Sequence, residues 1–294
     1  MTDMKRLDGR VAVVTGAGRG IGAAVARALA LEGAYVVVSD AGVDMDGAGH
    51  DATPAAQVTS EIEAAGGKAI ADSTDVTDYE ACRRLIDTAV SEFGRLDILV
   101  NAAGILRDRM IFNLSEADWD IVVAVHLKGT FNTTRHAATY WRNNRGGDYR
   151  LINFTSGSGL FGAPTQPNYA AAKMGIIGLT FSCANSLYNY GVRANAVAPV
   201  AGTRMTIEQR PEVYTADKMS PENVAPTVVY LASPESEWLN GRVIWSGGGR
   251  IGLVSNPVIE REVISREPWD VASVAATFEE TFRPVVEGRG PFGG

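Results

Sequence analysis

Residues 11–22 read VAVVTGAGRGIG, and this stretch decides the fold. Its first five residues are mostly β-branched and predict a buried strand, Val11–Thr15. The glycines that follow allow a tight turn. The next segment, Ile21–Glu32, places apolar side chains at helical spacing and ends before Gly33, a residue typical of helix C-termini. The stretch therefore predicts a strand, a glycine-rich turn and a helix in direct succession.

Short apolar runs alternate with helical patterns along the rest of the chain. Further strands are predicted at residues 35–39, 68–71, 98–101, 150–155, 193–197 and 243–246. Helix starts are also marked, because Thr77 with Glu80 and Ser115 with Asp118 have the spacing of a capping box. About seven strands separated by helices predict an α/β fold of the Rossmann type, a doubly wound parallel sheet with helices on both faces.

The chain shows no internal repeat and no linker rich in Pro, Gly or Ser, so we predict a single domain over residues 1–294. Two loops interrupt the alternation: a segment rich in Gly and Asp at 41–51, and a polar segment at about 203–219. Loops at the carboxyl ends of parallel strands shape ligand sites, and we assign the second loop to the substrate. From about residue 250 the chain continues as a C-terminal extension.

The composition argues against several classes of function. There are 27 Lys and Arg against 34 Asp and Glu, a net charge of −7, which disfavours nucleic acid or an anionic membrane as a partner. Cys82 and Cys183 lack metal or disulfide spacing, and the three His residues form no ligand pair, so no metal is expected. No apolar run reaches the roughly 18 residues of a membrane span. The polar N-terminus leaves no room for a signal peptide, and the cytoplasm is the default compartment.

The glycine-rich turn predicts a dinucleotide site. Glycines let the backbone approach a pyrophosphate closely, and a helix N-terminus offers N–H groups and partial positive charge to phosphates. The residues assigned to this part of the site are Gly16, Gly18, Arg19, Gly20, Ile21 and Gly22. The alternative interpretation is a tight turn that binds nothing.

Asp40 ends the second predicted strand, about 20 residues beyond the glycines. From that position a carboxylate accepts hydrogen bonds from both hydroxyls of the adenosine ribose, and it repels the 2′-phosphate of NADP. NAD is therefore the predicted cofactor, although Arg19 in the glycine loop leaves NADP open. Asp40 also has a second interpretation, as a turn-forming residue before Gly42.

Two further motifs are Asn101-Ala102-Ala103-Gly104 and Tyr169-Ala170-Ala171-Ala172-Lys173. Together with the T-G-x-x-x-G-x-G loop and a serine thirteen residues before the tyrosine, they make the chain resemble the short-chain dehydrogenase/reductase family over about residues 9–250. Residues 104–109, 125–131 and 198–206 are similar, more narrowly, to the dehydrogenase part of the peroxisomal multifunctional β-oxidation enzymes. That group oxidises (3R)-hydroxyacyl-CoA with NAD.

The resemblance implies hydride transfer between a secondary alcohol and a ketone. Free tyrosine, with a pKa of about 10, is too weak an acid for this chemistry near neutral pH. Lys173 lies one helical turn after Tyr169, and its ammonium favours the phenolate. In the family the lysine also holds the nicotinamide ribose, and a serine that matches Ser156 binds the reacting oxygen; Ser158 is the nearby competitor. His126 stands at a fourth catalytic position that is usually Asn, and we favour a supporting role over direct proton transfer.

The same resemblance implies further cofactor contacts, on both sides of the catalytic group. These residues are Asp75, Val76, Asn101, Ala102, Gly104, Pro199 and Thr203. Asp75 and Val76 are expected beside the adenine, and Thr203 beside the nicotinamide carboxamide, although a threonine there also suits the cap of a short helix.

The substrate is marked less clearly. Guanidinium groups suit the phosphates of coenzyme A, and the arginines expected near the mouth of the site are Arg107, Arg109, Arg204 and Arg210. The candidates for an apolar channel are Met205, Tyr214 and Met219. A 3-hydroxyacyl-CoA dehydrogenase is the leading hypothesis, with a hydroxysteroid or other ring-alcohol dehydrogenase and a nonenzymatic dinucleotide sensor as alternatives. The intact Ser, Tyr and Lys set disfavours the sensor, and the family likeness suggests a homodimer or homotetramer.

Overall fold

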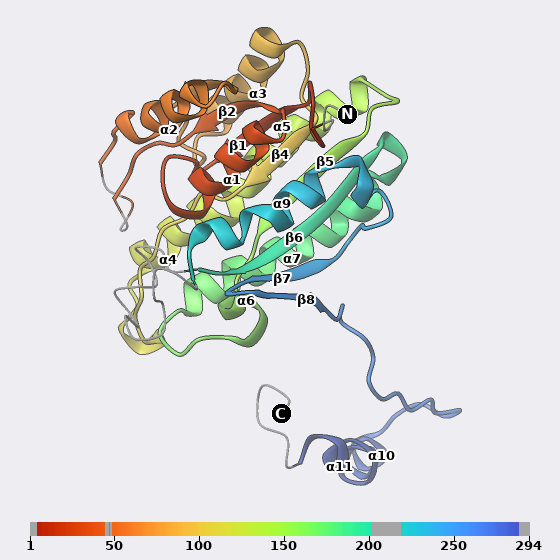
Figure 1. Ribbon diagram of the computed structural model, residues 1–294. Coiled ribbons are helices and arrows are strands. Elements are labelled where there is room, and N and C mark those ends of the chain that lie inside the picture. Colours follow the sequence, from red (N-terminus) through yellow and green to blue (C-terminus); the bar gives the residue numbers. More distant parts are fainter. Residues whose placement is uncertain (1–4, 45–46, 48, 202–218, 288–294) are drawn as a thin grey trace. The chain divides into compact units, whose positions relative to one another are not determined.

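The computed structural model describes residues 5–44, 47, 49–201 and 219–287 (Figure 1). The chain divides into two compact units, Met1–Val254 and Ser255–Gly294. The first unit holds the sheet, and the second carries α10 (Val271–Thr277), η6 (Phe278–Phe282) and α11 (Arg283–Val286). The expected organisation, one domain with an extension from about residue 250, stays a prediction.

The first unit is built on an eight-stranded sheet in the order β3-β2-β1-β4-β5-β6-β7-β8. The strands are β1 (Val11–Thr15), β2 (Tyr35–Ser39), β3 (Lys68–Asp72), β4 (Ile98–Asn101), β5 (Tyr149–Phe154), β6 (Val192–Val200), β7 (Val243–Gly247) and β8 (Arg250–Val254). The Rossmann-type α/β fold and the seven predicted strands are confirmed. β8 corrects the expectation of a wholly parallel sheet, because it pairs antiparallel with β7. Its short, largely exposed run follows a cluster of glycines, which in the sequence is typical of a loop.

Helices cover both faces of the sheet (Figure 1). One face packs against α1 (Gly20–Leu31), α2 (Thr53–Ala64) and α9 (Ala225–Ala232), and the other against α3 (Tyr79–Phe93), α5 (Gly129–Asn143) and α7 (Pro167–Ser186). Shorter segments are η1 (Ile111–Asn113), α4 (Glu116–Val123), the π-helical η2 (Ala124–Lys128), α6 (Gly157–Phe161), η3 (Tyr188–Tyr190), η4 (Pro221–Asn223) and η5 (Pro234–Ser236). Alternate residues of β2 supply the two cores, because successive side chains of a strand point to opposite faces.

One predicted helix cap is confirmed and one is wrong. The Ser115 hydroxyl accepts a hydrogen bond from the Asp118 N–H at 3.1 Å and caps α4. At α3 the capping side chain is Asp78, which accepts from the Ala81 N–H at 2.9 Å. Thr77 does not cap because its hydroxyl donates backwards to Asp75 at 2.8 Å.

The sheet order reverses between β1 and β4, and ligands bind at such switch points, outside the carboxyl ends of the strands. Gly16 follows β1 with φ +64°, and a Cβ there would lie 2.6 Å from the Cα of Ala103, in the loop after β4. A side chain would push the two loops apart. The glycine therefore fixes the close approach that forms the floor of a site.

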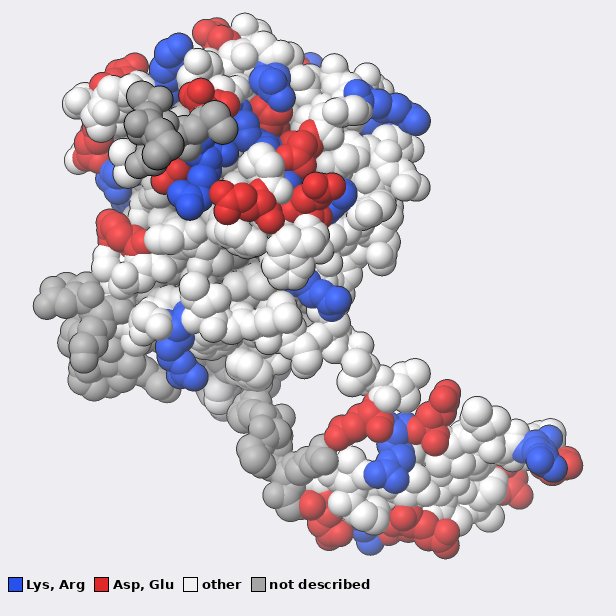
Figure 2. Space-filling model, turned by 45° about the vertical axis from the view of Figure 1, so that its right-hand side comes forward, with Lys and Arg blue, Asp and Glu red and all other residues white. Residues whose placement is uncertain are grey.

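Among the described residues, no helix has the length and apolar character needed to cross a bilayer, and no group of His, Cys, Asp and Glu is arranged to hold a metal ion. In the view of Figure 2, positive and negative side chains are interspersed and do not form one uniformly positive surface.

Candidate active site

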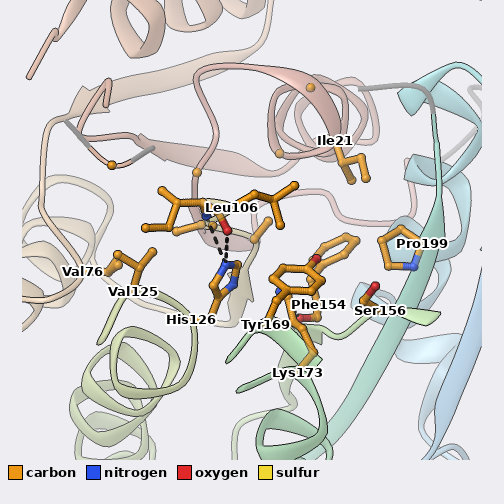
Figure 3. A pocket seen from close by; sticks show the side chains of 18 of the residues that line it. Ile21, Val76, Leu106, Val125, His126, Phe154, Ser156, Tyr169, Lys173 and Pro199 are labelled. Carbon is orange, nitrogen blue, oxygen red and sulfur yellow. Dashed lines mark hydrogen bonds between the residues drawn. The ribbon is translucent and has the colours of Figure 1, made fainter. Parts of the chain in front are cut away.

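A cavity of about 570 Å³ lies at the carboxyl ends of the strands (Figure 3). The predicted site residues that line it are Gly16, Arg19, Gly20, Ile21, Gly22, Asp40, Asp75, Val76, Ala102, Gly104, His126, Ser156, Tyr169, Lys173 and Pro199. Gly18 and Asn101 are not among the lining residues, and Thr203 lies outside the described residues. Residues from loops far apart in the sequence are thus gathered around one space.

Asp40 joins the two loops at one end of the cavity. Its Oδ2 accepts a hydrogen bond from the Gly18 N–H at 2.7 Å, and its Oδ1 accepts from the Gly42 N–H, also at 2.7 Å. The second contact is the turn-forming one considered above. Each carboxylate oxygen has two lone pairs, so both oxygens keep acceptor capacity for a further partner. Arg19 lines the same end, with Nη1 3.5 Å from the Val43 carbonyl oxygen.

The N-terminus of α1 fits a phosphate group. No side chain caps it, so its first N–H groups keep their donor capacity beside the glycine loop. The floor formed by Gly16 against the loop of Ala103 leaves room that a side chain would fill. The residues present therefore suit the pyrophosphate of a dinucleotide.

Asn101 supports this floor from inside the protein. Its Nδ2 donates to Asn153 Oδ1 at 2.9 Å and to Thr134 Oγ1 at 3.2 Å, and its Oδ1 accepts from Thr133 Oγ1 at 2.7 Å. The side chain is buried and engaged by these three partners. It holds the end of β4 in place and does not reach into the cavity.

The two candidate serines differ in their partners. Ser156 Oγ accepts a hydrogen bond from the Ser158 N–H at 3.1 Å, and the Ser156 side chain lies near enough to the phenol of Tyr169 to lower its pKa. Ser158 Oγ donates to Gln166 Oε1 at 2.7 Å, and Gln166 Nε2 donates to Asp108 Oδ2 at 2.9 Å. The Ser158 proton is committed to this chain of contacts, whereas Ser156 faces the phenol, so the geometry favours Ser156 at the reacting oxygen.

Lys173 and Tyr169 share α7 but differ in setting. The buried Lys173 Nζ donates to the Phe154 carbonyl oxygen at 2.7 Å and lies 5.5 Å from the centre of the Tyr169 ring. Burial lowers the pKa of Lys173 to about 7. Burial raises the pKa of Tyr169 to about 12, although the hydrogen bond with Ser156 lowers it. In the chain by itself the pKa of Tyr169 is thus raised and not lowered as expected, because loss of water around the phenol, together with the charge of Asp108, outweighs the effect of Ser156.

The depressed pKa of Lys173 makes a prediction about stability. In the unfolded chain the amine titrates near 10.5, and in the folded chain near 7, so the unfolded state binds more protons between these values. The contribution of Lys173 to the free energy of unfolding therefore rises with pH between about 7 and 10.5. Below pH 7 the folded protein bears the full cost of burying the charged amine. Lys173→Met removes the penalty and should exceed the wild type in free energy of unfolding by on the order of a few kcal/mol at pH 7.

This difference should shrink towards pH 10, as measured by urea unfolding of both proteins from pH 6.5 to 10. Other titrating groups are common to the two proteins and cancel. A difference that does not change with pH would mean that Lys173 stays charged in the folded protein.

His126 and Ser156 lie on opposite sides of Tyr169 in the cavity (Figure 3). It is 2% exposed, and its Nε2 lies 2.8 Å from the carbonyl oxygen and 3.1 Å from the N–H nitrogen of Ile105. Its ring meets Tyr169 edge-on, with centroids 5.0 Å apart. A Cβ at Gly104 would lie 2.4 Å from His126 Cε1, which explains the glycine there. Burial, and then the charge of Lys173, lower the pKa of His126 well below its usual value, so the neutral imidazole suits a supporting role.

The predicted substrate contacts that the structure describes do not line the cavity. Arg107 pairs with Asp118 at 3.8 Å, Arg109 donates to the Asp108 carbonyl oxygen at 2.9 Å, and neither lines the cavity. Met219 is not part of the lining either. The remaining candidates, which lie outside the described residues, are Arg204, Met205, Arg210 and Tyr214.

The lining also includes residues that the sequence analysis did not assign to the site, among them Phe154, Gln166 and Trp245. Strand alternation gives a signal for Trp245, since it shares a face of β7 with the buried Val243. For Gln166, whose contacts span 58 residues to Asp108, the sequence carries no local signal.

Comparison with known proteins provides a further line of evidence about the family of this chain. Residues 10–213 match the family model described as short chain dehydrogenase. The hydroxyacyl-CoA dehydrogenase ChsB1 of Mycobacterium tuberculosis is 43% identical, over 96% of this chain and 91% of its own length. The peroxisomal multifunctional enzyme type 2 of Mus musculus is also 43% identical, over 86% of this chain, which spans only 33% of that enzyme. A crystal structure of a short chain dehydrogenase from Mycobacterium avium is 45% identical, with a TM-score of 0.84 over 94% of this chain and 96% of that one.

Proposed function

Because the chain belongs to the short chain dehydrogenase family of oxidoreductases, we propose that it interconverts the secondary alcohol of a 3-hydroxyacyl-CoA and the corresponding ketone, with NAD as cofactor. One observation carries the proposal. A single cavity is lined at one end by Asp40 and the glycine loop, and at the other by Ser156, Tyr169 and Lys173. The first set of groups suits a dinucleotide, and the second set suits an alcohol that exchanges a proton.

The dinucleotide sits, in this proposal, with its pyrophosphate at the N-terminus of α1 and its adenosine ribose at Asp40. A bound nicotinamide supplies the hydride acceptor for oxidation and the donor for reduction. Asp75 and Val76 flank the adenine, while Pro199 lies beside the nicotinamide. Arg19 faces the ribose end.

The proton is handled by the chain itself. Tyr169 exchanges it with the substrate oxygen, and Ser156 holds that oxygen by a hydrogen bond. With its pKa raised to about 12, the phenol of the chain by itself is protonated, the form that donates to a ketone. Oxidation needs the phenolate, and a positive charge on Lys173 favours it. His126 keeps the Tyr169 ring in place through its edge contact and acts as a positioning residue.

The acyl-CoA part of the proposal draws on the names of the relatives. ChsB1 is a hydroxyacyl-CoA dehydrogenase by name, and this chain aligns with nearly all of it. The multifunctional enzymes are much longer, so this chain corresponds at most to one part of them. A ring-alcohol dehydrogenase remains the second candidate, since the same proton and hydride chemistry would serve it.

An activity panel tests the proposal. Purified protein is assayed with NAD and with NADP against (3R)- and (3S)-hydroxybutyryl-CoA and a set of hydroxysteroids, following absorbance of the reduced cofactor. We expect kcat/KM with NAD and one hydroxybutyryl-CoA enantiomer to exceed every steroid value by at least about tenfold. Activity confined to the steroids would reject the acyl-CoA assignment, and binding of NAD with no turnover of any alcohol would favour the sensor.

The proposal also includes an oligomeric state and a cellular compartment. We propose self-association as a homodimer or homotetramer, in which exposed apolar side chains on α4, α5 and α7 such as Trp119, Phe131 and Met174 become buried. The cytoplasm remains the proposed compartment, although several relatives carry the word peroxisomal in their names.

A further inference from the structure

One aromatic side chain lines the cavity without a part in the steps above. Trp245 lies in the middle of β7, where the register pairs it with Ala198 of β6, the residue before Pro199. On its other side the paired residue of β8 is Gly252, and a Cβ there would lie 3.5 Å from the Trp245 Cβ. The indole is therefore flanked along the sheet by two small residues.

The far edge of the indole lies beside the candidate catalytic serine. A Cβ at Gly157, the residue after Ser156, would lie 3.2 Å from Cη2 and 3.3 Å from Cζ3 of Trp245. The ring of Phe161, on the same short helix α6, has its centroid 6.1 Å from that of the indole. In Figure 3, Ser156 and Pro199 lie on one side of Tyr169 and His126 lies on the other. Trp245 thus belongs to the Ser156 side of the reacting centre.

The two ends of the cavity also differ in the charge of their lining residues. The charged lining residues near the glycine loop are Arg19, Asp40, Asp44 and Asp75. The described lining near Trp245 carries no carboxylate or guanidinium group: it combines the apolar Gly157, Val200 and Ala201 with the hydroxyls of Ser156 and Ser158, and the Lys173 amine donates to the Phe154 carbonyl oxygen. An uncharged part of the substrate is favoured at this end, because charged groups would lose water there without gaining a partner.

We infer that Trp245 is a specificity-determining residue: its indole forms an apolar shelf beside Ser156 that favours a bulky, ring-bearing group on the carbinol carbon over a short linear one. This rests on the proposed function, which sets the carbinol oxygen at Ser156 and Tyr169. A rigid ring covers the flat indole face while losing few rotatable bonds, so it gains more from the shelf than a flexible chain does.

The test compares two thioesters that differ only at the carbinol substituent. These are 3-hydroxybutyryl-CoA, with a methyl group, and 3-hydroxy-3-phenylpropanoyl-CoA, with a ring. Trp245→Ala should lower kcat/KM for the ring-bearing substrate about tenfold, mainly through KM, and lower the value for the methyl substrate by a clearly smaller factor. Trp245→Phe should fall between the wild type and the alanine variant. Trp238→Ala is the matched control, since Trp238 is 73% exposed and lies outside the cavity lining.

The outcomes separate the inference from the function beneath it. Equal losses for both substrates would mean that Trp245 only supports the fold, and an unchanged ring-bearing value would mean that the shelf is not used; either result overturns the inference. If the wild type oxidises neither thioester, the proposed function fails. The same variants are then compared on 1-phenylethanol and 2-butanol. The ratio of kcat/KM for the ring-bearing alcohol over the linear one should fall in Trp245→Ala, and an unchanged ratio would overturn the inference.

Discussion

Replacing Tyr169 by Phe is expected to lower kcat by about 10²- to 10⁴-fold while NAD binds within a few-fold of the wild type. Phe keeps the ring that meets His126 edge-on and removes only the phenol hydroxyl, whose pKa Ser156 lowers. The variant therefore deletes the proton donor and acceptor without opening a cavity. Turnover is measured from cofactor absorbance, and NAD affinity by titration of intrinsic fluorescence.

The two serines supply matched controls for this result. Ser156→Ala removes the partner of the phenol and should also reduce kcat strongly. Ser158→Ala removes a hydroxyl already bound to Gln166, so its effect on kcat should be much smaller. A Tyr169→Phe protein that turns over normally would refute the acid/base assignment, and equal losses for the two serine variants would refute the choice between them.

Much of the fold and site could be predicted because the signals are local. β1, the glycine turn and α1 follow each other within residues 11–31, and each element is specified by its own residues. The same holds for Tyr169 and Lys173, whose spacing on one helix places them on one face. Once the sheet order is fixed, loops after parallel strands meet at one edge, so Gly16 and Ala103 come together although 87 positions separate them.

The rest depends on contacts that leave no local trace. The chain from Ser158 through Gln166 to Asp108 forms only when two loops meet, and it decides between the serines. The direction of the Tyr169 pKa depends on how much protein surrounds the phenol, which spacing alone does not reveal. β8 escaped prediction because exposed edge strands lack the alternation that burial imposes on central ones.

A second large effect is expected at Asp40. Asp40→Asn should shift the ratio of kcat/KM for NAD over NADP towards NADP by about 10- to 100-fold, because the carboxylate charge that repels a 2′-phosphate is removed. Asparagine keeps one carbonyl oxygen for the N–H groups of Gly18 and Gly42, so the loops stay joined better than in Asp40→Ala. The melting temperature of each variant shows how much of any loss in activity comes from the loops.

The gain for NADP should depend on Arg19, which lines the same end of the cavity and offers a guanidinium group to a 2′-phosphate once Asp40 is neutral. The double variant Arg19→Gln with Asp40→Asn should therefore lose affinity for NADP while keeping its turnover with NAD. If Asp40→Asn leaves the NAD to NADP ratio unchanged, the carboxylate serves only the turn before Gly42. Since its two oxygens already hold that turn and the glycine loop together, such a result would reduce Asp40 to a structural anchor and leave the choice of dinucleotide to residues elsewhere in the cavity.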